Sequence, residues 1–295
     1  MKTAIVTGAT SYLGIELVIR LVHEGIKVHI ITRAESDVTR LMLRSSNINI
    51  HTHDGTQKSL TNIFSTVEPD TVFHLASKYA REEGPEDITA LIASNITFGC
   101  QVLQAAANST VRNFINTGSY FQFNEGGKPP INLYGVTKNL FTQILDYYTS
   151  SKKISSTSLI IYDVYGPKDW RTKLFPNITK AINNNLPLSI PKEEILLYPV
   201  YYSDVINCFF LAANKLTNEP ESVSGKCFAV RDKTPNKISE IIAVFEKVSG
   251  KQVLIKRGDW PKPAKEIKNI WYGQTLPGWQ PNFSLLAGIE SILKE

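Results

Sequence analysis

The first half of the chain alternates short apolar runs with longer segments in which apolar residues recur at helical spacing. Short apolar runs bounded by loop residues predict buried strands, and the periodic segments between them predict helices. The predicted strands cover residues 3–7, 27–32, 47–52, 71–76, 113–117 and 156–162, and the predicted helices include 13–21, 60–67, 88–107 and 134–150. This alternation predicts an α/β fold with a Rossmann-type, doubly wound parallel sheet.

The second half of the chain is less regular, because prolines and loop signals become frequent after Pro167. One more strand at 226–230 and a helix at 238–248 precede a tail rich in proline and tryptophan. We therefore expect a first domain at 1–165, to which the strand near 226–230 returns. Residues 166–295 are expected to form a smaller, irregular C-terminal lobe.

A glycine-containing loop follows the first predicted strand and opens the first helix. Backbone amides at a helix N-terminus bind a pyrophosphate, and small residues allow its close approach. The loop therefore predicts a dinucleotide site, although a tight turn without a ligand is the alternative. Its candidate cofactor-binding residues are Gly8, Thr10, Ser11, Tyr12, Leu13 and Gly14. Ser11 stands where a middle glycine is usual, so this turn is expected to differ slightly.

The end of the second predicted strand carries Thr32 and Arg33 and no acidic residue. An acid at this place usually accompanies NAD, whereas an arginine is suited to pair with the 2′-phosphate of NADP. Arg33 therefore favours NADPH, and a solvated surface arginine is the alternative. Asp54, just after the third predicted strand, is expected to approach the adenine.

Tyr134 and Lys138 lie four residues apart in a predicted helix, fifteen residues after Ser119. Residues four apart share a helix face, and a nearby ammonium lowers the pKa of a phenol from about 10. We therefore expect Lys138 to make Tyr134 usable as a proton donor or acceptor near neutral pH. Tyr148 and Lys152 have the same spacing, so spacing alone does not choose between the two pairs.

Composition excludes several classes of protein. The chain has 295 residues, and 32 basic against 27 acidic side chains give a formal charge of +5 without a basic stripe, which argues against nucleic-acid binding. The three cysteines and five histidines lack metal-ligand or disulfide spacing, so no metal is expected. Apolar runs fall short of the roughly 20 residues that a membrane span needs. We expect a cytoplasmic protein without a membrane partner.

Together these segments resemble the extended short-chain dehydrogenase/reductase family, also called the NAD-dependent epimerase/dehydratase family. The resemblance covers nearly the whole chain and is carried by the glycine loop, His74-Leu-Ala-Ser77, Tyr134-Gly-Val-Thr-Lys138 and Val164-Tyr-Gly-Pro167. Three segments, FINTGSYF, YGPKDWRTKLFP and GWQPNF, look like those of the CDP-abequose and CDP-paratose synthases. Those enzymes are NADPH-dependent reductases of a CDP-4-keto-3,6-dideoxyhexose.

The resemblance implies roles for individual residues. Ser119, Tyr134 and Lys138 match the catalytic set: Ser119 would hold the substrate carbonyl, Tyr134 would protonate it, and Lys138 would hold the nicotinamide ribose. Cofactor contacts are further implied for Leu75, Ala76, Ser77, Asn95, Thr117, Tyr134 and Lys138. Substrate contacts are expected at Lys78, Tyr79, Ser119, Tyr120, Lys173, Asn177 and Arg257.

Two features of the sequence separate the reactions of the family. Dehydratases resemble Thr-Asp-Glu at the positions of Ser119, Tyr120 and Phe121, and both carboxylates are missing here. With Arg33, this favours reduction of the C4 ketone of a nucleotide-linked 4-keto-6-deoxy or 3,6-dideoxy hexose, in deoxysugar biosynthesis for a surface polysaccharide such as O-antigen. The alternatives are an epimerase with tightly bound NAD and a non-catalytic NADP-binding sensor.

One departure from the family pattern concerns the substrate's phosphates. The arginine that typically meets the diphosphate is replaced by Leu197, and Arg171, Lys173, Lys192 and Arg257 are candidates to substitute for it. The helices at 88–107 and 134–150 look like the pair that forms a dimer interface in the family. A homodimer is therefore expected.

Overall fold

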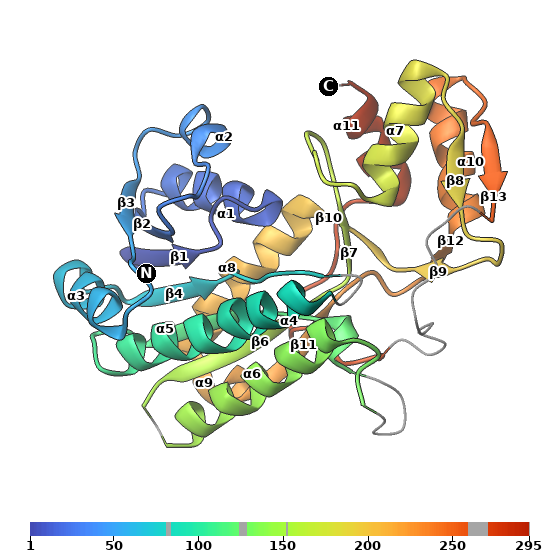
Figure 1. The fold of residues 1–295 in the computed structure, drawn as a ribbon. Coiled ribbons are helices and arrows are strands. Elements are labelled where there is room, and N and C mark those ends of the chain that lie inside the picture. The colour runs from blue at the N-terminus through green and yellow to red at the C-terminus, as the bar shows by residue number, and fades with distance from the viewer. Residues whose placement is uncertain (81–83, 124–128, 152, 259–270, 295) are drawn as a thin grey trace.

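The computed structural model describes residues 1–294 except 81–83, 124–128, 152 and 259–270. Its centre is a sheet of seven strands in the order β11-β6-β5-β4-β1-β2-β3, all paired in parallel (Figure 1). The strands are β1 (Thr3–Thr7), β2 (Lys27–Thr32), β3 (Asn49–Thr52), β4 (Thr71–His74), β5 (Asn113–Ser119), β6 (Ser155–Ile161) and β11 (Lys226–Val230). The predicted doubly wound parallel sheet is confirmed.

The ends of four strands differ from the sequence expectation, and β6 (Ser155–Ile161) does so by one residue at each end. β3 begins at Asn49 rather than at 47, and β4 ends at His74 rather than at 76. β5 continues through Thr117 to Ser119, where the side chain of Ser119 caps a short 3-10 turn (Tyr120–Gln122). The candidate catalytic serine is thus the last residue of a central strand.

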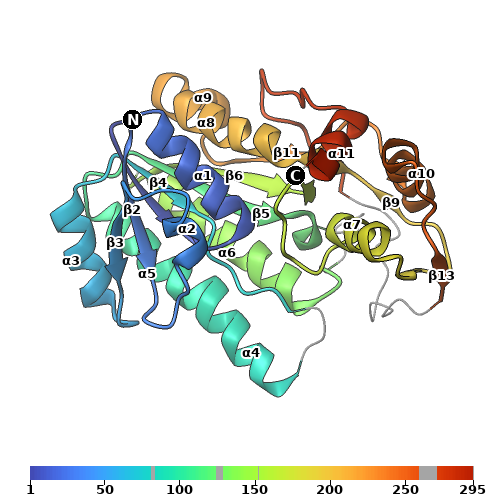
Figure 2. The ribbon, with the colours of Figure 1, turned by 90° about the horizontal axis from the view of Figure 1, so that it is seen from above.

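Helices cover both faces of the sheet (Figure 2). The helices α1 (Tyr12–His23) and α8 (Tyr202–Asn218) share one apolar core with β1 and β2. On the other face lie α3 (Gln57–Val67), α5 (Phe98–Ala107) and α6 (Leu133–Ser150). Short helices α2 (Thr39–Met42) and α9 (Pro220–Val223) lie in the connections. The sheet is therefore buried on both faces, as its continuous apolar strands require.

A long helical run leads into α5. It begins with α4 (Pro85–Ile92) and continues through a π-helical turn (Ala93–Thr97). By length and composition alone Glu86–Ala107 would suit a membrane span, with 33% of its apolar stretch buried, but one such helix is weak evidence because helices of soluble proteins pass the same test. Asn95, in the π-turn, is buried, and π-turns are frequent at functional sites.

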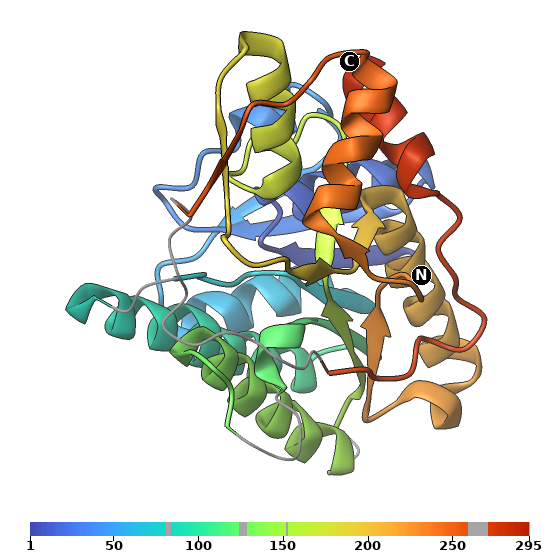
Figure 3. The ribbon, with the colours of Figure 1, turned by 90° about the vertical axis from the view of Figure 1, so that its right-hand side faces the viewer.

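A smaller lobe stands beside the carboxyl edge of the sheet (Figures 1 and 3). Its helices are α7 (Leu174–Asn184), α10 (Ile238–Ser249) and α11 (Leu285–Lys294), which share a separate apolar core. Its strands form three pairs: β7 (Asp163–Tyr165) with β10 (Pro199–Tyr201), β8 (Leu188–Ile190) with β13 (Ile255–Arg257), and β9 (Leu196–Leu197) with β12 (Asn236–Lys237). Although α8 and β11 come from the second half of the chain, they belong to the sheet layers. The division at residue 165 stays a prediction.

Candidate active site

The glycine loop has the geometry of a close-packed strand-to-helix turn. Gly8 has a φ of +69°, and a Cβ there would lie 2.5 Å from the backbone nitrogen of Ala76. A Cβ on Gly14 would collide with the carbonyl oxygen of Gly8. Ser11 is the N-cap of α1, and its Oγ accepts a hydrogen bond of 3.1 Å from the Gly14 amide. A serine suits this position because it caps the helix, and the backbone cradle fits a dinucleotide pyrophosphate.

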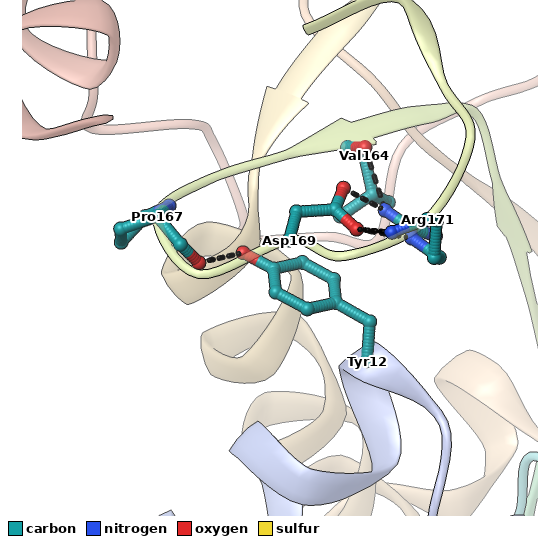
Figure 4. A network of polar contacts seen from close by, with 5 residues as sticks. All are labelled: Tyr12, Val164, Pro167, Asp169 and Arg171. Atoms are coloured by element: carbon teal, nitrogen blue, oxygen red, sulfur yellow. Dashed lines mark hydrogen bonds and ion pairs between the residues drawn. The ribbon is translucent and has the colours of Figure 1, made fainter. Parts of the chain in front are cut away.

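Tyr12 and Leu13 contribute packing to the loop. Leu13 is buried in the core beneath α1. The Tyr12 hydroxyl donates to the Pro167 carbonyl at 3.0 Å, and the Arg171 guanidinium lies 4.7 Å from its ring centre (Figure 4). Tyr12 therefore ties the loop to the segment that enters the smaller lobe.

Arg33 and Asp54 lie just beyond the ends of the adjacent strands β2 and β3. Arg33 is exposed and forms an ion pair of 3.1 Å with Glu35. The Asp54 carboxylate accepts from the amide and the hydroxyl of Thr56, at 2.9 and 2.7 Å, and so shapes the turn into α3. Their contacts with NADP and adenine stay predictions.

The loop after β4 is held in place by side chains from other elements. The Thr7 hydroxyl accepts from the Ala76 amide at 3.3 Å and hydrogen-bonds with His74 Nδ1 at 2.9 Å. The Asn95 amide group bonds both backbone groups of Lys78 and the Thr137 hydroxyl. Asn95 thus links this loop to α6, and it positions the expected cofactor contacts Leu75, Ala76 and Ser77.

Ser119, Tyr134 and Lys138 come together at the carboxyl edge of the sheet. Ser119 ends β5, and the other two lie in the first turns of α6, which is capped by Asn132. The Lys138 ammonium is buried and donates to the carbonyl oxygen of Thr117 at 2.8 Å. Tyr134 hydrogen-bonds with Ser119 and also with Ser77. The three residues thus lie close together, and their catalytic roles stay predictions.

The expected effect of Lys138 on Tyr134 is wrong. Burial raises the pKa of Tyr134 to about 12, and the hydrogen bonds with Ser119 and Ser77 only partly oppose this. Burial also lowers the pKa of Lys138 to about 8. The ammonium fails to lower the phenol's pKa because desolvation dominates and because it is directed at Thr117. Tyr134 is therefore a protonated phenol near neutral pH.

The rival pair has a different environment. The Tyr148 hydroxyl donates to the side chain of Gln104 on α5 at 2.5 Å, so it joins two helices. Lys152 lies outside the described residues. In the part of the chain that the structure describes, only the first pair is thus seen to lie beside Ser119.

The expected substrate residues separate into two groups. Tyr79 packs edge-on against Tyr134 with 5.0 Å between ring centres, and the Lys173 ammonium lies 4.8 Å from the Tyr79 ring centre. The Tyr120 ring stacks on Phe121 at 4.5 Å. Tyr79 thus contacts Tyr134 directly, and Lys173 and Tyr120 are linked to it through Tyr79 and Phe121. The others lie farther out: Lys78 faces Asp87 at 3.8 Å, Asn177 is half-buried on α7, and the exposed Arg257 on β13 lies 3.9 Å from Glu194.

Sequence reasoning missed Asp163, the first residue of β7. Its carboxylate accepts from the Tyr198 amide at 3.0 Å and from the Tyr120 hydroxyl at 3.5 Å. Burial raises the pKa of this carboxyl group, and the Tyr198 amide and the Lys173 charge partly offset this rise. An acid directly after the strand expected at 156–162 was the available signal. Asp163 therefore places a carboxyl group next to Tyr120.

The candidate phosphate ligands are mostly engaged elsewhere. Arg171 donates to both carboxylate oxygens of Asp169, at 2.8 and 2.7 Å, and to the Val164 carbonyl (Figure 4). Lys192 and Arg257 are exposed on the smaller lobe. Within the described ranges, no cluster of three potential metal ligands is present.

Comparisons with known proteins show the family of this chain. Residues 4–224 match the model of the NAD dependent epimerase/dehydratase family, so the chain belongs to that family. CDP-abequose synthase of Yersinia pseudotuberculosis is 24% identical over 277 residues, which cover 92% of this chain and 94% of that protein. The same-named enzyme of Salmonella typhimurium is 24% identical over 297 residues, covering 98% and 97%.

A solved structure shows the same fold. The UDP-glucuronic acid 4-epimerase from Bacillus cereus, in complex with UDP-glucuronic acid and NAD, superposes with a TM-score of 0.84. The match covers 99% of this chain and 98% of that one at 23% identity.

Proposed function

We propose that this protein is an NADPH-dependent reductase of the C4 ketone of a nucleotide-linked 4-keto-6-deoxy or 3,6-dideoxy hexose. The similarity to two CDP-abequose synthases over nearly their full length supports a nucleotide-sugar substrate. The structural neighbour from Bacillus cereus binds a UDP-sugar and NAD, which supports the same class of substrate and cofactor.

The placement of Ser119, Tyr134 and Lys138 together at the carboxyl edge of the sheet is the observation that carries this proposal. A ketone that receives hydride from the nicotinamide develops negative charge on its oxygen, and the site must then supply a proton. With a pKa raised to about 12, Tyr134 is protonated at neutral pH and suits this task. Ser119, hydrogen-bonded to Tyr134, would donate to the same oxygen.

The surroundings of Ser119 disfavour dehydration. Elimination of water needs an additional acid and base, and the two positions after Ser119 carry Tyr120 and Phe121. Asp163 restores one carboxyl group beside Tyr120, but this group already accepts two hydrogen bonds. Reduction requires, besides hydride from the nicotinamide, only one proton, which Tyr134 would give.

For the cofactor we propose NADPH over NADH. Arg33 is exposed at the end of β2 and is suited to pair with a 2′-phosphate once it exchanges its Glu35 partner. The structural neighbour's bound NAD makes NADH the alternative.

The direct test is a spectrophotometric panel of nucleotide-linked 4-keto sugars, with CDP, dTDP, GDP and UDP as bases and with NADPH or NADH. We expect wild-type protein to oxidise NADPH with at least one of them and Tyr134→Phe to lose that activity, because it lacks the proton donor. Tyr148→Phe is the matched control and should keep wild-type rates.

The outcomes separate the alternatives. Equal, negligible rates of wild type and Tyr134→Phe with every keto sugar would sink the reductase and favour the NADP-binding sensor. An epimerase would instead copurify with NAD and interconvert sugars without net oxidation of added cofactor.

We also propose that the protein is a homodimer. The helical run through α4 and the helix α6 pack against each other and expose Ile88, Ile92, Leu140 and Tyr147. Exposed apolar side chains on adjacent helices suit a protein interface. Light scattering after size exclusion measures the mass, and a monomer at micromolar concentration would contradict this proposal.

A further inference from the structure

Arg231 is a buried arginine just beyond the end of β11. The residue is 4% exposed, and no carboxylate of the described residues forms an ion pair with it. Its Nη1 donates to the Asp232 carbonyl at 2.9 Å, its Nη2 reaches the Gly273 carbonyl only at 3.5 Å, and its side chain also hydrogen-bonds with Tyr162. Nε is buried without a hydrogen-bond partner. A buried charge without a counterion is costly, so this arrangement suggests that an anion completes it.

Aromatic rings hold the guanidinium by its faces. Its central carbon lies 3.4 Å from the ring centre of Tyr272 and 5.4 Å from that of Tyr198. Cation–π contacts of this kind leave the edges of the group for hydrogen bonds in its plane. Nε and Nη2 form one edge, and its two parallel N–H groups match two oxygens of a phosphate.

Strand pairing places Arg231 in line with the catalytic serine. Val230 is in register with Ile161, and Ile161 with Ser119, so Arg231, Tyr162 and Tyr120 follow in the next row. Two strand spacings separate the ends of this row by about 10 Å. The Tyr162 ring fills the middle, 5.0 Å from Tyr120 and 5.8 Å from Tyr198. Ligands of open α/β sheets bind outside these carboxyl ends.

Arg231 also lies near residue 197, where the family pattern has an arginine and this chain has a leucine. β9, which contains Leu197, pairs with β12, the short strand that follows Arg231 in the chain. The next residue, Tyr198, contacts the guanidinium. Arg231 thus brings a positive charge close to the place where the family pattern lacks one.

We propose that Arg231 binds the diphosphate of a nucleoside diphosphate through its Nε and Nη2 edge. The identity of the ligand as a nucleotide-linked sugar rests on the proposed function. Because Nε is shielded from solvent, the phosphate reaches it when the Tyr272 ring turns outward. Tyr272 is 59% exposed, and its hydroxyl bonds the Lys233 carbonyl at 2.8 Å.

Calorimetric titration with CDP, dTDP, GDP and UDP tests this site without turnover. We expect Arg231→Met to weaken binding of the preferred diphosphate by about 10- to 100-fold, the range for a hydrogen bond to a charged group. Arg231→Lys keeps the positive charge but loses the pair of parallel N–H donors, so its affinity for the diphosphate should lie between those of wild type and Arg231→Met. Arg112→Met is the matched control, because Arg112 is exposed at the amino end of β5, and it should bind as wild type does.

Retained binding of NADPH, measured by fluorescence, shows that each variant is folded. If Arg231→Met is poorly folded, the diphosphate affinity of Arg231→Lys is the deciding measurement. Wild-type affinity for the diphosphate in the folded arginine variants, or no binding of any of the four diphosphates by wild type, would overturn the inference. Diphosphate binding that depends on Arg231 without any ketone reduction would sustain the inference and reject the reductase. Reduction of a keto sugar with an unchanged KM in the arginine variants would sustain the reductase and reject the inference about Arg231.

Discussion

The two sides of the sheet's carboxyl edge are built in different ways. On the side of β1 and β4, the cradle consists of a glycine loop, Thr7 and the backbone near Ala76, with little room for side chains. On the side of β6 and β11, the equivalent place holds large side chains, including Tyr120, Asp163 and Arg231. The first side suits a ligand bound by backbone amides, and the second suits a ligand recognised by side chains.

This difference shows which changes each side tolerates. A backbone cradle is sensitive to any added atom, because the clash is with main chain that cannot move alone. A side-chain surface changes its preference when one group is replaced. Mutations of the backbone cradle should therefore abolish binding, whereas mutations of the side-chain surface should change which ligand is preferred.

The largest effect is expected at Gly8. Gly8→Ala combines a positive φ with a clash against the Ala76 backbone, so we expect loss of NADPH binding and a large fall in stability. Gly25 has a similar φ of +73° with nothing within 4 Å of its Cβ, so Gly25→Ala should cost only about 1–2 kcal/mol. Fluorescence titration with NADPH and thermal unfolding measure both. Equal effects would show that the loop is not a close-packed cradle.

Ser119 stands between the two sides and should give the next largest effect. Ser119→Ala removes a hydrogen bond to Tyr134 and the proposed donor to the substrate oxygen, so kcat should fall by about 10²–10³. Ser77→Ala removes only the other hydrogen bond to Tyr134 and should cost less. Steady-state kinetics compare them, and a greater loss from Ser77→Ala would reverse the two roles.

His74 makes the cofactor side sensitive to acid. Burial lowers the pKa of His74 to about 3, with a smaller effect of the Lys138 charge, so below pH 6.5 the unfolded chain takes up a proton that the folded chain cannot. Stability is complete above pH 6.5 and should fall by about 2 kcal/mol by pH 5 from this residue. His74→Phe should reduce this slope in urea unfolding at several pH values, and substitution of the exposed His23 by asparagine should not. An unchanged slope in His74→Phe would contradict the burial argument.

The smallest effects, expected at Asp163 and Asp54, should separate substrate binding on one side from cofactor binding on the other. Asp163→Asn alters the carboxyl group beside Tyr120, so we expect the KM for the sugar substrate to rise about tenfold with unchanged NADPH affinity. Asp54→Asn, near the end of β3, should do the opposite and weaken NADPH by a few-fold. Steady-state kinetics with each of the two substrates varied measure this. If either variant changed both the KM for the sugar and the affinity for NADPH, the two sides would not be independent.

The local motifs were predictable because their geometry depends on short stretches of chain. The glycine loop, the strands and the turn of α6 that carries Tyr134 and Lys138 are set by neighbours a few residues away. The pKa of Tyr134 was not predictable, because it depends on how much of the surrounding protein excludes water from the phenol. Proximity of Lys138 in the sequence says nothing about desolvation.

The sequence by itself determined the parallel sheet, the dinucleotide loop and the catalytic candidates, since each rests on local periodicity or on spacing along one element. Only the tertiary structure brought Asp163 beside Tyr120 and Arg231 against Tyr198. These pairs join residues from different strands and loops, and their contacts depend on strand order and register. The side proposed to contact the cofactor is thus encoded locally, and the side proposed to recognise the substrate arises from the packing of distant segments.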